Sequence, residues 1–154
     1  MHPAGVSDVV PIGNMQGDDD TCLLNLQHQE ARQYLRSHKW CFGIGEEYFG
    51  IGIGGIVAVF LMQLEPRATG VDEWLWIVAG DIPSAYLVLD ELPNPTAALE
   101  AYIGLMRDWE VLAAQDKTSP DVFPVSAAPN PENALALRGR LDLIEEFYGF
   151  EHQT

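Results

Sequence analysis

The chain has 154 residues, of which 47% are hydrophobic and 20% charged, a composition typical of one globular domain with a single core. Its 23 acidic and 8 basic side chains give a formal net charge of -15, so phosphate backbones would repel it, and we exclude DNA and RNA as partners. This acidity serves either solubility or the binding of a basic protein partner.

The cysteines and histidines match no metal-binding or catalytic pattern. Cys22 and Cys41 are too few for a disulfide framework, and we interpret both as reduced thiols. His28 and His38 lie ten residues apart on one predicted helix, about 15 Å along its axis, so they cannot share a metal ion. The first eight residues lack the basic and apolar regions of a signal peptide. We therefore expect a cytoplasmic protein with no metal and no cofactor.

The N-terminal part of the chain predicts an arm followed by a helix. Residues 1–19 contain several prolines and glycines and no sustained apolar period, so we expect a flexible arm before one α+β domain over residues 20–150. From Thr21 onward, apolar residues recur at helical spacing. This pattern predicts a first helix over residues 21–38.

The uncharged stretch of residues 49–64 invites two functional interpretations. As a membrane span it is too short and too rich in glycine and β-branched residues. Gly50, Gly52 and Gly55 match the GxGxxG spacing of dinucleotide-binding loops, but the residues that follow are of β type and do not open a helix. We therefore predict neither a membrane span nor a nucleotide site.

The same stretch predicts a β-hairpin. Gly54 and Gly55 are interpreted as a two-residue type I′ turn, in which both residues need a positive φ, between strands over residues 47–53 and 56–64. The glycines inside the first strand indicate either a bulge or the close approach of another chain segment.

The rest of the chain predicts two more strands and two helices. Residues 73–79 and 85–89 are rich in β-forming side chains, and four consecutive strands with short turns favour an antiparallel meander. An Asn-Pro pair starts each final helix, at Asn94 and at Asn130. We expect an α+β fold in which both final helices pack on the four-stranded sheet.

Two groups of residues are candidate binding sites. Adjacent Glu46 and Glu47 are the carboxylates best suited to acid-base chemistry or to a small ligand, although neighbours on a strand point to opposite faces. Trp74 and Trp76 share one strand face, directly after Asp72 and Glu73. These tryptophans belong either to the core or, together with the two acids, to a partner-binding surface.

The segment from Asp72 to Val88, continued by residues 94–102 and 106–109, resembles a family of small acidic bacterial proteins of uncharacterised function. The similarity covers a hairpin and a helix, within residues 72–109. Such proteins are similar in size and acidity to immunity proteins that neutralise toxins. The acidity, the absence of catalytic motifs and the tryptophan-bearing strand favour an intracellular protein-binding domain, and sequestration of a basic partner such as a toxin is one activity of this kind. The alternative is a small-ligand-binding protein or an enzyme with its site near the adjacent glutamates.

Overall fold

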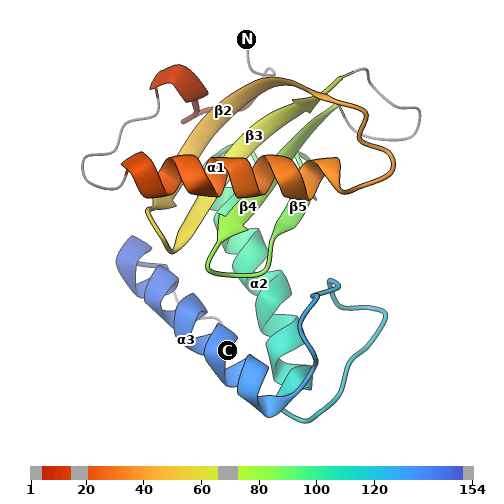
Figure 1. Ribbon diagram of the computed structural model, residues 1–154. Helices are drawn as coiled ribbons and strands as arrows, with labels where there is room; N and C mark the ends of the chain where they lie inside the picture. Colours follow the sequence, from red (N-terminus) through yellow and green to blue (C-terminus); the bar gives the residue numbers. More distant parts are fainter. Residues whose placement is uncertain (1–4, 15–20, 66–72, 151–154) are drawn as a thin grey trace. The chain divides into compact units, whose positions relative to one another are not determined.

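The computed structural model describes residues 5–14, 21–65 and 73–150 (Figure 1). Within these ranges the protein contains a five-stranded antiparallel sheet and three α-helices, which confirms the predicted α+β class. The chain divides into two compact units, Met1–Leu99 and Glu100–Thr154, and the boundary between them falls inside helix α2.

The first helix, α1 (Thr21–Arg36), lies across one face of the sheet (Figure 1). It ends two residues earlier than predicted. Leu24, Ala31 and Leu35 recur at helical spacing and are buried in the core. The sheet side chains of the same core cluster come from β3 and β4 and are Ala58, Phe60, Met62, Leu64, Leu75, Ile77 and Ala79.

The sheet is a meander in which each strand pairs with the next one along the chain. Its strands are β1 (Val10–Pro11), β2 (Ile44–Ile53), β3 (Val57–Leu64), β4 (Trp74–Gly80) and β5 (Ala85–Val88). The four predicted strands are confirmed as β2 to β5. Short turns between them made this antiparallel order the only one that needs no long crossover.

Strand β1 was not predicted, and it lies in the stretch interpreted as an arm. Val10 pairs with Phe49 and Pro11 with Tyr48, at the edge of the sheet beside β2. Proline has no backbone N–H and is tolerated at such an edge, where no further strand needs that donor. Two residues are too few to show strand periodicity, so sequence patterning could not identify β1.

The predicted hairpin between β2 and β3 is confirmed, but the predicted type I′ turn is wrong: the loop is longer by one residue, and only Gly55 of the two glycines has a positive φ. Ile53 pairs with Val57, which leaves three residues between them, and the Ile56 N–H donates to the Ile53 carbonyl at 3.0 Å. Gly55 has a φ of 83°, which a residue with a side chain rarely adopts. The turn therefore needs glycine at residue 55.

Both alternatives predicted for the strand glycines, a β-bulge and the close approach of another chain segment, apply to Gly50. Phe49 pairs with Phe60 and Ile51 pairs with Val59, so Gly50 is the extra residue of a β-bulge. A Cβ at Gly50 would also lie only 2.5 Å from the Cβ of Pro95. The space beside Gly50 is thus filled by Pro95 of the same chain, and the glycine-rich segment is part of a β-hairpin.

We predict that Gly50→Ala lowers the free energy of unfolding by about 1–3 kcal/mol, because the added methyl group overpacks the contact with Pro95. Urea denaturation measures the change. Gly139→Ala is the control, since a Cβ there meets nothing within 4 Å and alanine favours a helix interior by up to about 1 kcal/mol. Equal stability of the Gly50 variant and the unmodified protein would contradict the close contact.

Aromatic rings cluster around the C-terminal end of α1. The ring centroids of Tyr34 and His38 are 4.9 Å apart, and Tyr86 on β5 lies 5.1 Å from His38 and 5.2 Å from Trp40. Burial, together with the neighbouring Tyr86, raises the pKa of Tyr34 to about 12. The Tyr34 phenol is therefore held neutral by the folded state.

This pKa predicts a loss of stability at high pH. Between about pH 10 and pH 12 the unfolded chain releases the Tyr34 proton while the folded protein retains it, so stability falls as the pH rises through this window. Urea denaturation at several pH values should show a smaller fall in the free energy of unfolding for Tyr34→Phe than for the unmodified protein. The reference is pH 8, at which the Tyr34 phenol is neutral in both the folded and the unfolded state. An equal fall in both proteins would contradict the burial of Tyr34.

Two helices complete the fold, α2 (Pro95–Ala113) and α3 (Pro131–Tyr148). Both predicted caps are present, because Asn94 Oδ1 accepts from the Ala97 N–H at 2.8 Å and Asn130 Oδ1 accepts from the Asn133 N–H at 2.9 Å. Apolar side chains recur at helical spacing on both helices and are buried: Leu99, Tyr102, Ile103, Met106 and Trp109 on α2, and Leu137, Leu141 and Ile144 on α3, whereas Tyr148 at the end of α3 is half-buried.

Candidate functional site

Polar side chains gather where β2 begins, β3 ends and β4 begins. Gln63 Nε2 donates to Glu73 Oε2 at 2.8 Å, and the Glu46 N–H donates to Gln63 Oε1 at 3.1 Å. A Cβ at Gly45 would lie 2.5 Å from Glu65 Oε2, so the Glu65 carboxylate reaches the same place. We call Glu46, Gln63, Glu65 and Glu73 the acidic strand end.

An aromatic pair adjoins the acidic strand end. Trp74 is half-buried, and its ring centroid lies 6.0 Å from that of Tyr48. The Tyr48 hydroxyl donates to Glu46 Oε1 at 3.4 Å, and burial, with the nearby Glu46 charge, raises the pKa of Tyr48. Trp74 therefore offers part of an apolar ring beside carboxylates.

The structure separates the two tryptophans of the predicted binding surface. Trp76 is 0% exposed, and its indole N–H donates to the Leu92 carbonyl at 3.0 Å, so this side chain belongs to the core. Glu73 and Trp74 both reach the surface and lie together. Asp72, the remaining member of the predicted surface, lies outside the described residues.

Glu46 and Glu47 point to opposite faces of the sheet and do not converge. Glu46 belongs to the acidic strand end, whereas Glu47 lies under α1. There Glu47 Oε1 pairs with His28 Nε2 at 2.9 Å, and Arg32 donates to Glu47 Oε2 at 3.1 Å. His28 is buried with its ring 5.3 Å from that of Phe60. A ligand at Glu47 would have to displace one of its two partners.

Sequence reasoning missed the cluster of Glu47, His28 and Arg32. Its sequence signal is the spacing of His28 and Arg32, which lie four residues apart on one helix face. Two such groups next to the apolar stripe of α1 require an acceptor on the sheet, because a buried polar group without a partner is costly. To identify Glu47 as that acceptor, one must also know how β2 is aligned with the neighbouring strand β3.

We predict that Glu47→Ala lowers the free energy of unfolding by about 2–4 kcal/mol, because His28 and Arg32 lose their common partner below α1. Urea denaturation measures the loss. The matched control is Glu46→Ala, on the adjacent and exposed residue, where we expect a much smaller loss than at Glu47. Similar losses in the two variants would contradict a structural role specific to Glu47.

The thiols and histidines show no catalytic arrangement in the part of the chain that the structure describes. Burial raises the pKa of the Cys41 thiol, which is the opposite of what a nucleophile needs. His38 Nδ1 is engaged with the Tyr34 carbonyl at 3.0 Å. Among the same residues, no three His, Cys, Asp or Glu side chains form a group able to hold a metal ion.

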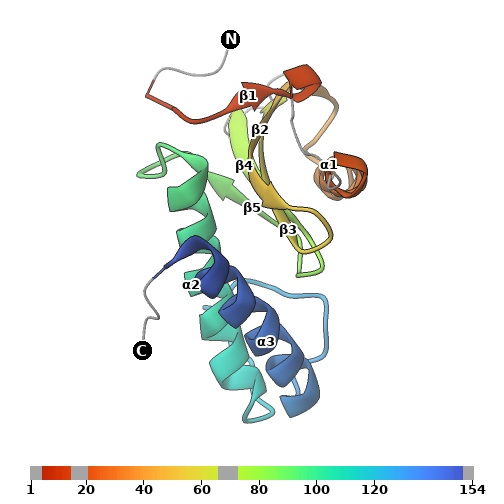
Figure 2. The same ribbon diagram turned by 90° about the vertical axis from the view of Figure 1, so that its left-hand side faces the viewer.

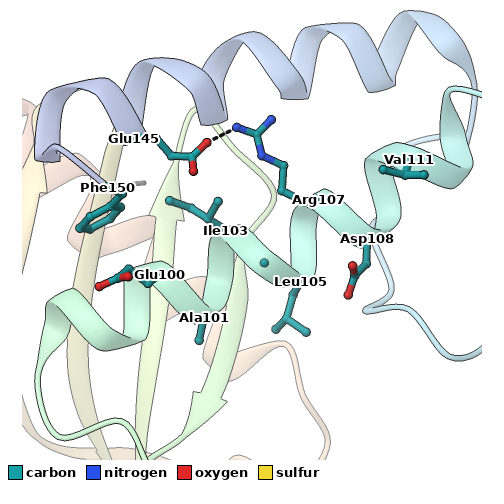
Figure 3. Close-up of a pocket in the computed structure, with 10 residues that line it drawn as sticks. Glu100, Ala101, Ile103, Leu105, Arg107, Asp108, Val111, Glu145 and Phe150 are labelled. Carbon is teal, nitrogen blue, oxygen red and sulfur yellow. Dashed lines mark hydrogen bonds and ion pairs between the residues drawn. The ribbon is translucent and has the colours of Figure 1, made fainter. Parts of the chain in front are cut away.

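The unit Glu100–Thr154 contains a second candidate site, a hollow of about 450 Å³ on α2 (Figure 3). Gly104 lies at the centre of the hollow. The α2 residues three, four and seven positions away from it share its helix face and also line the hollow. Residues that line the hollow include Glu100, Ala101, Leu105, Asp108 and Val111 of α2, together with Glu145 of α3 and Phe150. We call this feature the Gly104 hollow.

Helices α2 and α3 run next to each other (Figure 2), and ion pairs beside the Gly104 hollow join them. Arg107 donates to Asp142 at 2.7 Å and to Glu145, and Arg138 of α3 donates to the buried Glu110. Residue numbers rise along α2 as they fall along α3, so the two helices are antiparallel. Burial lowers the pKa of Arg107, but the hydrogen bonds to Asp142 and Glu145 outweigh it and raise the pKa. The Arg107 charge is therefore neutralised locally.

The remaining surface of α3 carries an apolar stripe. Leu135, Leu143 and Phe147 recur at four- and eight-residue spacing and are 65%, 48% and 64% exposed. Gly139 falls in the same row, and a Cβ there would meet nothing within 4 Å. Glu132 is an exposed neighbour of this row.

No family model matches the chain, and no curated protein or solved structure does either. None of the helices in the described ranges is both long enough and apolar enough to cross a membrane.

Proposed function

We propose that this chain binds a basic intracellular protein and that the acidic strand end is a contact surface. The observation that carries the proposal is the grouping of exposed Glu46 and Glu65 with Glu73 around the half-buried Trp74. Carboxylates attract a basic partner from a distance, and a tryptophan that loses water on contact slows its release.

The net charge of -15 supports a basic partner in particular. Complementary charge raises association rates and discriminates against acidic competitors, whereas contact with an aromatic anchor mainly determines residence time. Sequestration of a toxin by an immunity protein is one activity of this kind. The similarity of residues 72–109 to small acidic bacterial proteins stays a prediction.

The alternative proposal, a small-ligand or enzymatic site at Glu46 and Glu47, has less support. The two carboxylates lie on opposite faces, and Glu47 already pairs with His28 and Arg32. An acid-base pair would need both groups within reach of one substrate atom.

The test begins with a pull-down from the native host at low and moderate salt, followed by purification of a captured basic protein. We predict that Asp72→Asn with Glu73→Gln lowers its association rate constant several-fold and flattens the salt dependence. The matched control removes two exposed acids elsewhere, through Asp121→Asn with Glu132→Gln. Capture of no basic protein, or equal effects of both double variants, would reject this surface.

Trp74 provides a separate prediction with the same purified partner. Trp74→Ala should raise the dissociation rate constant more than it lowers the association rate constant, because the ring acts after contact. Trp74→Phe keeps an aromatic ring against Tyr48 and should show a smaller effect. Thermal melting of both variants separates a binding loss from unfolding. Unchanged dissociation in a folded Trp74→Ala protein would remove this residue from the interface.

A further inference from the structure

Gly104 lies in the interior of α2 with no packing reason for its small size. A glycine costs a helix interior about 1 kcal/mol relative to alanine. A Cβ at Gly104 would meet nothing within 4 Å, so the described chain does not exclude a side chain there. What the glycine provides is the open space of the Gly104 hollow.

Carboxylates flank this open space on the same helix face. Glu100 and Asp108 lie one turn before and one turn after Gly104, and both are exposed. Within the described part of the chain, neither carboxylate has a hydrogen bond or an ion pair. Both are therefore available to a cationic group at the rim of the hollow.

The rest of the lining is mainly apolar. Ala101, Leu105 and Val111 of α2 contribute aliphatic surface, and Phe150 contributes an aromatic ring (Figure 3). Among the described residues that line the hollow, Arg107 is the single basic one, and Asp142 and Glu145 neutralise it. An apolar cavity with an acidic rim suits a group that has an aliphatic stem and a positively charged end.

We infer that the Gly104 hollow receives an arginine side chain of the basic protein proposed above. The arginine stem lies against Ala101 and Leu105, and its guanidinium pairs with Glu100 or Asp108. Arginine fits better than lysine because its planar head is more weakly hydrated, binds carboxylates through two parallel hydrogen bonds and stacks on aromatic rings such as Phe150. This inference rests on the proposed function for the class of partner.

The experiment uses the full ¹⁵N-labelled chain and two synthetic peptides, acetyl-Ala-Leu-Arg-Leu-Ala-amide and its citrulline analogue. Citrulline keeps the shape of arginine but has no charge. NMR titration with the arginine peptide should shift the amide signals of Gly104, Asp108 and Phe150. The citrulline peptide should bind roughly fivefold or more weakly, because charge-assisted hydrogen bonds are lost.

Gly104→Leu fills the hollow and should weaken binding of the arginine peptide by roughly fivefold or more. Leucine favours a helix interior over glycine, so the fold is retained. Gly139→Leu is the matched control, because Gly139 also lies in a helix interior where a Cβ would meet nothing within 4 Å. This control should leave peptide affinity unchanged.

Three results would overturn the inference: no shifts at the hollow, equal binding of both peptides, or unchanged affinity in Gly104→Leu. A loss in Gly139→Leu alone would assign the contact to the exposed stripe of α3 instead. The two variants can also be compared with the purified basic protein. If Gly104→Leu leaves its affinity unchanged while Glu73→Gln weakens it, the hollow is rejected and the proposed function is retained. Peptide binding at the hollow without any captured basic protein would reject the proposed function and leave the arginine site standing.

Discussion

The pairing of Glu47 with His28 and Arg32 is the interaction on which the arrangement of the first unit depends. It joins β2 to α1 at a place where the neighbouring contacts are apolar, and it occupies both oxygens of one carboxylate. A buried charge keeps its place only with its partners, so the pairing specifies how α1 lies on the sheet. It also determines which of two adjacent glutamates faces outward.

That orientation leads directly to the acidic strand end. Because successive side chains on a strand alternate, the position of Glu47 under α1 leaves Glu46 on the opposite face of the sheet, where the buried Tyr48 donates to its carboxylate. Gln63 then connects Glu46 to Glu73 through its amide group. The carboxylates of Glu46 and Glu73 are each held by a hydrogen bond from a neighbouring strand residue, and groups held this way lose little conformational entropy when a partner binds.

The acidic strand end and the Gly104 hollow share one chemistry, although they belong to different units. Each combines surface carboxylates with an accessible apolar element, Trp74 in one and the wall around Gly104 in the other. Such surfaces favour side chains with long aliphatic stems and positive ends. A nonspecific acidic coat would need only the carboxylates, so the apolar elements are what favour a protein partner over simple solubility.

The sequence by itself determined the local structure: α1 from its apolar spacing, β2 to β5 from their β-forming runs, and both later helix starts from Asn94 and Asn130. These signals are local, since capping and periodicity depend on residues a few positions apart. Only the tertiary structure decided that Trp76 is core while Trp74 reaches the surface, that Glu47 pairs with α1, and that Gly104 opens a hollow. Each of these depends on which segments meet across long sequence separations, and a single sequence contains no direct record of those contacts.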